Sequence, residues 1–292
     1  AQGDLEEVKK LLAQGADDIE AGGPVADLTA NWPGHPRADA VSLRWAGALH
    51  AAALTKRDPA LAAAYPGAGG DWSMDRIWSA ATAFMQREEG WMRAFMTSPP
   101  QTNETGRSTG LAAGFMWLAQ RTPEPFHLFE LGASAGLNLN WDRFAYAWPS
   151  WGRAAEGGPF IPTEIRGGEL PPWRSIAIST RAACDQNPLD PANAEDRLRL
   201  RAYVWADQPA RLARLNAALD IALATGVKVE KADAAVWTRQ ALAGELPVGT
   251  SVIYHSVFLQ YPPQDVREAI REAIAAAGAR TSPGRRLAWL SF

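Results

Sequence analysis

The chain has 292 residues, of which 47% are hydrophobic and 21% are charged, and its formal net charge is -3. This balance is typical of a globular protein and excludes a chain that is mostly disordered. The length fits one large α/β domain or a core domain with a smaller partner. No window holds the roughly 18 consecutive apolar residues of a membrane-spanning helix, and no stretch resembles a signal peptide. We therefore expect no membrane partner and, by default, a cytoplasmic location.

Cysteine and histidine usage restricts the chemistry. The single cysteine, Cys184, excludes an intramolecular disulfide and a zinc site built from several cysteines. The four histidines are scattered, and no pair has a spacing that would place two metal ligands on one face. These cysteine and histidine patterns therefore predict no metal site. Because the net charge is low and the arginines are interspersed with acidic residues, we also expect no nucleic-acid binding.

The first part of the chain is predicted to be helical. A short amphipathic helix capped by Asp4 is expected to end at Gly15, and further helices are expected at residues 41–54, 75–96 and 101–120. Proline and glycine residues separate these segments. We therefore assign residues 1–98 to an N-terminal helical cap and residues 99–292 to a second domain.

After residue 125 the pattern changes to short apolar runs that alternate with helical stretches, which is typical of a βαβ chain. We expect strands at residues 126–131, 175–179, 227–230, 251–258 and 286–291, and helices at residues 135–146, 194–224 and 263–277, the second of them broken near residue 209. Right-handed crossovers would then give a Rossmann-like three-layer α/β sandwich with a mainly parallel sheet in the order 3-2-1-4-5. The sequence ends inside a predicted strand, which leaves a C-terminal truncation open.

The loop after the first predicted strand carries the main functional signal. Gly132 and Gly136 would let the backbone turn tightly through Ala133 and Ser134 and let a nucleotide-like ligand approach. The following helix would offer free N–H groups to an anion. An acidic residue, here Glu130, followed by Gly-x-x-x-Gly resembles the first motif of Rossmann-like methyltransferases. We therefore assign all five residues to cofactor binding.

The same loop has two other interpretations. Its Gly-x-Ser-x-Gly pattern matches a nucleophile elbow, in which Ser134 would be the nucleophile of a serine hydrolase and His255 would complete a triad. This elbow would lie on the first strand of the sheet, and no glycine-rich oxyanion segment precedes it, so the hydrolase is less favoured. In the other interpretation the loop is a structural turn that packs a helix tightly on the sheet.

Two acidic residues after the next predicted strands extend the adenosyl-ligand interpretation. Asp185 follows the second strand and is the candidate partner of ribose hydroxyls. Asp233 follows the third strand, in a segment that resembles the short acidic turn used by methyltransferases near the adenine amine. An Asp-Asn-Pro turn and a helix N-cap are the structural alternatives for the two residues.

The fourth predicted strand supplies the candidate catalytic residues. In the expected strand order it lies beside the first strand, so His255 and Tyr261 would face the glycine loop across the switch point. A histidine in an apolar strand can equally be a core residue.

Another polar cluster precedes the first strand. Asn103, Glu104 and Arg107 have the spacing of one helix face, and a guanidinium suits the carboxylate of a substrate or amino acid. We assign Asn103 and Arg107 to ligand binding, with a surface pair between Glu104 and Arg107 as the alternative. Aromatic residues of the cap, Trp45 or Trp72, would close the apolar side of the cavity.

Several stretches together resemble a bacterial family catalogued as domain of unknown function 2332. They lie at residues 43–50, 101–108, 132–139, 185–190 and 203–205 and span most of the chain. The fold of this family is similar to that of S-adenosylmethionine-dependent methyltransferases. The resemblance therefore implies S-adenosylmethionine as the ligand.

These observations predict a protein that binds S-adenosylmethionine and transfers its methyl group to a small-molecule acceptor. Because the methyl group of a sulfonium is already activated, the protein would mainly align the acceptor, with His255 removing a proton. A non-catalytic nucleotide-like ligand-binding protein and the serine hydrolase are the alternatives. The sequence identifies neither the methyl acceptor nor the oligomeric state.

Overall fold

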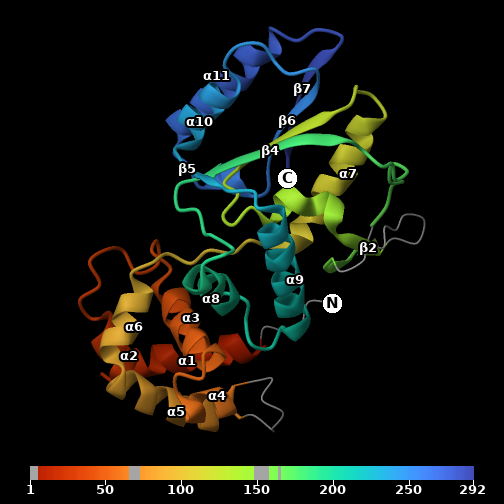
Figure 1. Cartoon of the computed structure of the whole chain (residues 1–292). Helices are drawn as coiled ribbons and strands as arrows, with labels where there is room; N and C mark the ends of the chain where they lie inside the picture. The colour runs from red at the N-terminus through yellow and green to blue at the C-terminus, as the bar shows by residue number, and fades with distance from the viewer. Residues whose placement is uncertain (1–5, 66–72, 148–157, 164–165) are drawn as a thin grey trace. The chain divides into compact units, whose positions relative to one another are not determined.

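A computed structural model describes residues 6–65, 73–147, 158–163 and 166–292. The chain divides into two compact units (Figure 1). The first unit contains residues Ala1–Thr102 and Ala194–Ala213, and the second contains residues Asn103–Asn193 and Arg214–Phe292. The sequence assigned residues 194–213 to the second domain, whereas the structure groups them with the N-terminal helices.

The first unit is built from helices. Their bounds are α1 (Glu6–Glu20), α2 (Pro24–Thr29), α3 (Val41–Leu54), α4 (Pro59–Ala64), α5 (Met74–Arg87), α6 (Glu89–Met96) and α8 (Ala194–Ala202), and α9 (Pro209–Thr225) begins in this unit. The single helix predicted at residues 75–96 is two helices, because Glu88 between them has non-helical dihedral angles. Asp4, the predicted cap of the first helix, lies outside the described residues.

Small residues in α3 allow the helices of this unit to pack closely. A side chain at Gly47 would lie 2.5 Å from the Tyr203 ring, so this glycine is needed where residues of the 194–213 segment meet α3. Trp45 is buried in the same core, where its indole N–H donates to the Met85 sulfur at 3.1 Å. The expectation that Trp45 closes a ligand cavity beside the sheet is therefore wrong, because its ring fills the helical core. Trp72 lies outside the described residues.

The second unit contains a parallel five-stranded sheet. Its strands are β1 (Phe126–Leu131), β4 (Ile178–Asp185), β5 (Glu230–Lys231), β6 (Gly249–His255) and β7 (Arg285–Ser291), and their order is β5-β4-β1-β6-β7. This confirms the predicted α/β class with a mainly parallel sheet. Two further short strands, β2 (Ala145–Ala147) and β3 (Phe160–Pro162), pair with each other.

Helices pack on both faces of this sheet. On one face, Leu131 and Ile253 pack with residues of α10 (Ala234–Ala241) and α11 (Gln264–Gly278). On the other face, Phe115 of α7 (Ser108–Ala119) contacts Phe126 and Tyr254. Short 3-10 helices complete the unit: η1 (Thr105–Arg107), η2 (Leu137–Arg143) and η3 (Phe258–Gln260).

The segment after the glycine loop differs from the prediction. Instead of an α-helix at residues 135–146 it forms the 3-10 helix η2, which is interrupted at Asn140. Asparagine side chains compete with the backbone for hydrogen bonds, which disfavours a regular helix in this segment. Within the described ranges, none of the helices combines the length and the apolar character needed to cross a bilayer.

Candidate functional site

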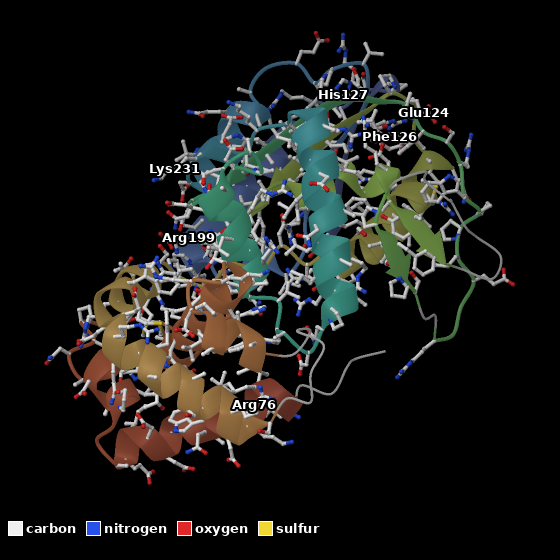
Figure 2. All side chains as sticks on the ribbon, turned by 60° about the horizontal axis from the view of Figure 1, so that its bottom comes forward. Arg76, Glu124, Phe126, His127, Arg199 and Lys231 are labelled. Carbon is white, nitrogen blue, oxygen red and sulfur yellow. The ribbon has the colours of Figure 1, made fainter. Side chains whose placement is uncertain are left out.

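The carboxyl ends of the strands in the second unit form the candidate site. Phe126 begins β1 and Lys231 ends β5, so these residues, labelled in Figure 2, mark an amino end and a carboxyl end of strands in the parallel sheet. β4 extends to Asp185, so this residue stands at the strand end and not several residues beyond it. The loop after β1, from Gly132 to Gly136, leaves the sheet at the same edge, because parallel strands share one direction.

The glycine loop has three residues in the left-handed region. The φ angles are +66° at Gly132, +55° at Ser134 and +70° at Gly136. Glycine adopts this region readily, whereas a serine there is strained and needs support from its surroundings. Positive φ angles at every second residue turn the backbone sharply between β1 and η2.

Every backbone N–H group from Gly132 to Leu137 already donates to the protein. The acceptors are the carbonyls of Cys184 and Ala133 and the side chains of Asp185 and Asn103. The free N–H groups expected for anion binding are therefore absent from this loop, because the chain itself uses them.

Asn103 and Asp185 hold the loop in place. The Asn103 side-chain oxygen accepts from the N–H groups of Ala135, at 3.2 Å, and Leu137, at 3.1 Å. The Asp185 carboxylate accepts from Ser134 N–H at 2.8 Å and from Asn187 N–H at 2.9 Å. The structure thus brings these two predicted ligand-binding residues to the loop, and their oxygen atoms bind its backbone.

Apolar side chains cover both glycines of the loop. A Cβ atom at Gly132 would lie 2.3 Å from the Phe258 ring, and one at Gly136 would lie 3.0 Å from Val229. The absence of a side chain at these positions therefore serves packing. A ligand could approach Gly132 only if Phe258 moved aside, and Phe258 lies in η3 as a partly exposed residue.

Arg107 reaches the end of β6. Its guanidinium donates to the Ser256 carbonyl through a long contact of 3.4 Å, and no acidic side chain among the described residues pairs with it. Glu104 instead accepts from the Gly106 N–H and caps η1. The expected common helix face is wrong, because Asn103 and Glu104 precede η1 and their side chains reach different partners.

The two candidate catalytic residues lie in different surroundings. His255 is buried, with its ring 6.1 Å from the rings of Phe258 and Trp289, and burial lowers its pKa to about 4. Neither ring nitrogen has a hydrogen-bond partner among the described residues. Tyr261, in contrast, is 73% exposed. His255 faces the α10 and α11 side of the sheet and makes no hydrogen bond to Ser134.

Glu130 points to the opposite face of the sheet. It pairs in register with Tyr254 of β6, and both side chains are buried on the α7 side. Burial raises the pKa of Glu130 to about 8; the interaction with the Tyr254 hydroxyl opposes this shift, and the charge of Asp185 adds to it. The carboxyl oxygen Oε2 has no hydrogen bond of ordinary geometry to a described residue. At neutral pH this carboxyl is therefore largely protonated.

The geometry gives the hydrolase interpretation no support. The oxyanion hole of a nucleophile elbow uses the N–H of the residue after the serine, and here Ala135 N–H donates to Asn103. Asp233 caps α10, because its carboxylate accepts from the N–H groups of Ala235 and Val236. Across the described part of the chain, no cluster of three or more His, Cys, Asp or Glu side chains could hold a metal ion.

The sequence analysis did not select Phe258, which packs on Gly132, or Tyr254, which pairs in register with Glu130. Both are apolar or aromatic residues in or after an apolar strand, so nothing in their local pattern distinguishes them from core residues. Asn138 and Asn140 gave a detectable signal, since polar amides alternate with leucines there, and both are buried with unpaired side-chain atoms.

Comparison with known proteins identifies the family. The family model described as "Uncharacterized protein conserved in bacteria (DUF2332)" matches residues 1–292. The chain belongs to this family. Among the curated proteins and the solved structures, neither comparison gave a match. The DUF2332 assignment covers both units, including the glycine loop and the helical unit.

Proposed function

We propose that the second unit binds S-adenosylmethionine at the carboxyl edge of its sheet and transfers the methyl group to a small-molecule acceptor. A Rossmann-like classification of this unit is part of the proposal, and the parallel order β5-β4-β1-β6-β7 supports it. The role of the first unit as a cap also belongs to the proposal.

The donor groups of Arg107 and Asn103 carry the proposal. Arg107 leaves most of its guanidinium N–H groups without a described acceptor, next to the end of β6. Asn103 uses its oxygen on the glycine loop, and its amide nitrogen makes no hydrogen bond to a described residue. A guanidinium and an amide N–H at one sheet edge suit a carboxylate, such as that of the amino-acid end of S-adenosylmethionine.

The adenosine end would lie along the ends of β4 and β5. Asp185 and the segment after Lys231 border this edge, since Cys184 and Asp185 pair in register with β5 and Ala232 N–H donates to the Asp185 carbonyl. Both Asp185 carboxylate oxygens already bind backbone N–H groups, so ribose hydroxyls would share these oxygens with them. Phe258 must also move from Gly132 if the ligand is to touch the loop backbone.

S-adenosylmethionine would supply a methyl group on a positively charged sulfur. The acceptor's lone pair would form the new bond to the methyl carbon while the carbon–sulfur bonding pair would return to sulfur, and the acceptor would then lose a proton. The protein aligns the two reactants and excludes water. His255 is neutral at pH 7 and can accept that proton once Phe258 exposes its ring. Tyr261 is placed at the outer side of η3, where an acceptor would arrive.

Calorimetric titration tests the binding step. We expect the protein to bind S-adenosylmethionine and its demethylated product, and Arg107→Ala to weaken both by about tenfold or more, because a charged hydrogen bond is lost. Arg271→Ala, an exposed arginine of α11, is the matched control and should leave binding unchanged. Absence of binding by the parent protein, or equal binding by the Arg107 variant, would reject the site.

Two further measurements separate the alternatives. Binding without methyl transfer to any member of a small-molecule acceptor library would favour the non-catalytic ligand-binding protein. Labelling of Ser134 by a fluorophosphonate probe, lost in Ser134→Ala, would establish the hydrolase and overturn the proposal.

A further inference from the structure

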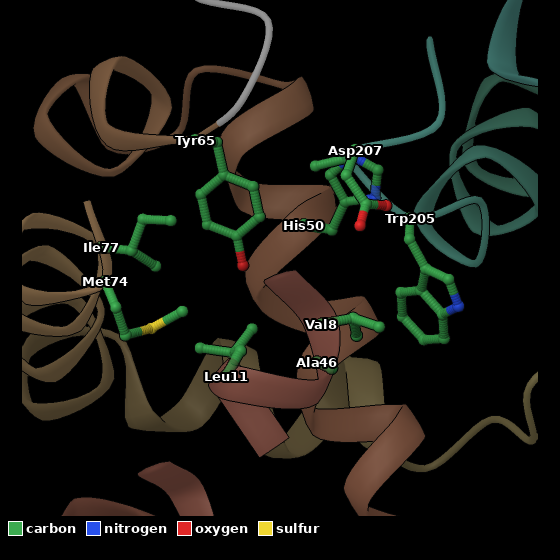
Figure 3. Close-up of a pocket in the computed structure, with 10 residues that line it drawn as sticks. Val8, Leu11, Ala46, His50, Tyr65, Met74, Ile77, Trp205 and Asp207 are labelled. Atoms are coloured by element: carbon green, nitrogen blue, oxygen red, sulfur yellow. The ribbon is translucent and has the colours of Figure 1, made fainter. Parts of the chain in front are cut away.

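The first unit contains a pocket that is lined by its own residues. The pocket and the open solvent at its mouth together occupy about 390 Å³, and the lining is mainly apolar and includes Val8, Leu11, Ala46, Met74, Ile77 and Trp205. Figure 3 shows these side chains around a common space, together with Tyr65, His50 and Asp207. The apolar lining favours the hydrocarbon part of a small ligand.

Tyr65 places an unpaired donor in this pocket. The residue caps the end of α4 and is only 8% exposed, and its hydroxyl points into the space between the lining residues (Figure 3). The hydroxyl makes no hydrogen bond to any described residue. Burial raises its pKa well above the ordinary value, so the hydroxyl stays protonated and keeps its donor capacity. Buried polar groups normally have a partner, so this one calls for an explanation.

His50 places an acceptor in the same pocket. Its Nδ1 atom lies 3.1 Å from the Ala202 carbonyl, and because a carbonyl only accepts, Nδ1 carries the proton. Burial lowers the pKa of His50 to about 4; the Ala202 hydrogen bond opposes this and the charge of Arg201 adds to it. The neutral ring therefore has a bare lone pair on Nε2, which has no hydrogen-bond partner among the described residues.

The two polar side chains are held together. The rings of His50 and Tyr65 lie nearly parallel, at 4°, with their centroids 5.8 Å apart. Asp207 also lines the pocket, and the mainly apolar wall disfavours a charged ligand, because burying a charge costs free energy. The pocket thus combines one donor, one acceptor and an apolar wall.

We propose that this pocket binds a small neutral molecule that joins a short hydrocarbon body to a group that both accepts and donates a hydrogen bond, such as a primary carboxamide. The carboxamide oxygen accepts from the Tyr65 hydroxyl, and its N–H donates to His50 Nε2. The apolar lining surrounds the hydrocarbon part. This inference concerns the helical unit alone and stands independently of the proposed function.

Isobutyramide and isobutyrate form a matched pair of probes, because they have the same hydrocarbon body and differ in the polar group. We expect isobutyramide to bind in the millimolar range, as measured by saturation-transfer and chemical-shift NMR of the full chain. Isobutyrate has no donor and carries a negative charge, so we expect it to bind at least about tenfold more weakly.

Two variants locate the binding. Tyr65→Phe keeps the shape of the pocket but removes the donor, and should weaken isobutyramide binding about fivefold or more. Ala46→Leu should block binding by filling the space. Arg271→Ala, at an exposed arginine of α11 in the other unit, should leave isobutyramide binding unchanged. The proposal is overturned if isobutyramide does not bind, if isobutyrate binds equally well, or if both pocket variants, shown to be folded by circular dichroism, bind it like the parent.

Discussion

The glycine loop of the second unit and the pocket of the first unit use their hydrogen-bonding groups in opposite ways. The loop has a motif that is typical of a binding site, yet its N–H groups from Gly132 to Leu137 all bind the protein itself. The pocket has no recognisable motif, yet Tyr65 and His50 keep unpaired atoms there. A sequence motif can thus reflect the backbone conformation that a turn requires. Unpaired hydrogen-bonding groups, in contrast, can be recognised only in the folded structure.

The largest effect is expected from filling the space at Gly132. Gly132→Ala should lose about 2–5 kcal/mol in the free energy of unfolding, because it combines a left-handed φ with a clash against Phe258. Gly244→Ala is the matched control, since this glycine has a φ of +79° and open space around it, and should lose about 1–2 kcal/mol. Equal losses in urea denaturation would show that Phe258 does not pack on the loop.

The pH dependence of stability tests the buried carboxyl of the second unit. Between the ordinary glutamate pKa of 4.5 and the folded pKa of about 8, the unfolded chain releases the Glu130 proton while the folded chain keeps it. Stability from this group is therefore complete below pH 4.5 and is lost as the pH rises towards 8. Between pH 5 and 8, the parent protein should lose up to about 4 kcal/mol relative to Glu130→Gln.

Comparing the parent with Glu130→Gln removes the contributions of the buried histidines, which both proteins share. His50 and His255 have lowered pKa values, so both proteins should lose stability as the pH falls from 6.5 towards 4. Parallel stability curves between pH 5 and 8 would contradict a neutral Glu130.

A smaller loss in the free energy of unfolding is expected when a side chain that accepts hydrogen bonds from the loop backbone is removed. Asp185→Ala should lose about 1.5–3 kcal/mol, because it removes a carboxylate that accepts from Ser134 and Asn187 N–H groups. Glu124→Ala is the control, since it removes one exposed contact to Ala177 N–H, and should lose less than about 1 kcal/mol. A negligible loss in the Asp185 variant would mean that water replaces the carboxylate, and the loop would then be open to ligands.

The smallest effect is expected at Tyr65. Tyr65→Phe should change the free energy of unfolding by less than about 0.5 kcal/mol or increase it, because the hydroxyl it removes has no partner. Tyr146→Phe provides the contrast, since this hydroxyl donates to the Trp141 carbonyl at 2.6 Å, and should lose about 1–2 kcal/mol. A loss of similar size at Tyr65 would indicate that its hydroxyl is paired in solution.

The elements predicted best from sequence are those with a long, uninterrupted pattern. The predicted helix at residues 41–54 coincides with α3, and the predicted strand at residues 126–131 coincides with β1. The strand predicted at residues 175–179 begins and ends before β4. Polar residues, including Arg181, occupy the partly exposed positions of β4 and hide the strand pattern. The α-helix predicted after the loop is wrong, because asparagine side chains in this segment compete for backbone hydrogen bonds and outweigh the apolar spacing.

The sequence indicates which polar residues lie at the candidate site, but it does not predict which groups their side chains bind. Asn103 and Asp185 were selected as hydrogen-bonding side chains, and both lie at the loop, but sequence cannot show that their acceptors are already used. Phe258 is separated from Gly132 by 126 positions in the sequence, and only the pairing of β1 with β6 brings them together. Contacts of this kind arise from topology and have no local signature.

The membership of residues 194–213 in the first unit has a consequence for synthesis. Tyr203 packs at Gly47 and the Ala202 carbonyl binds His50, so the N-terminal helices cannot complete their core until the ribosome has made about two thirds of the chain. During that interval the apolar faces of α1 and α3 are exposed to solvent and to chaperones. The intervening residues, including β1 and β4, emerge meanwhile and must wait in turn for residues 214–292, which complete the second unit.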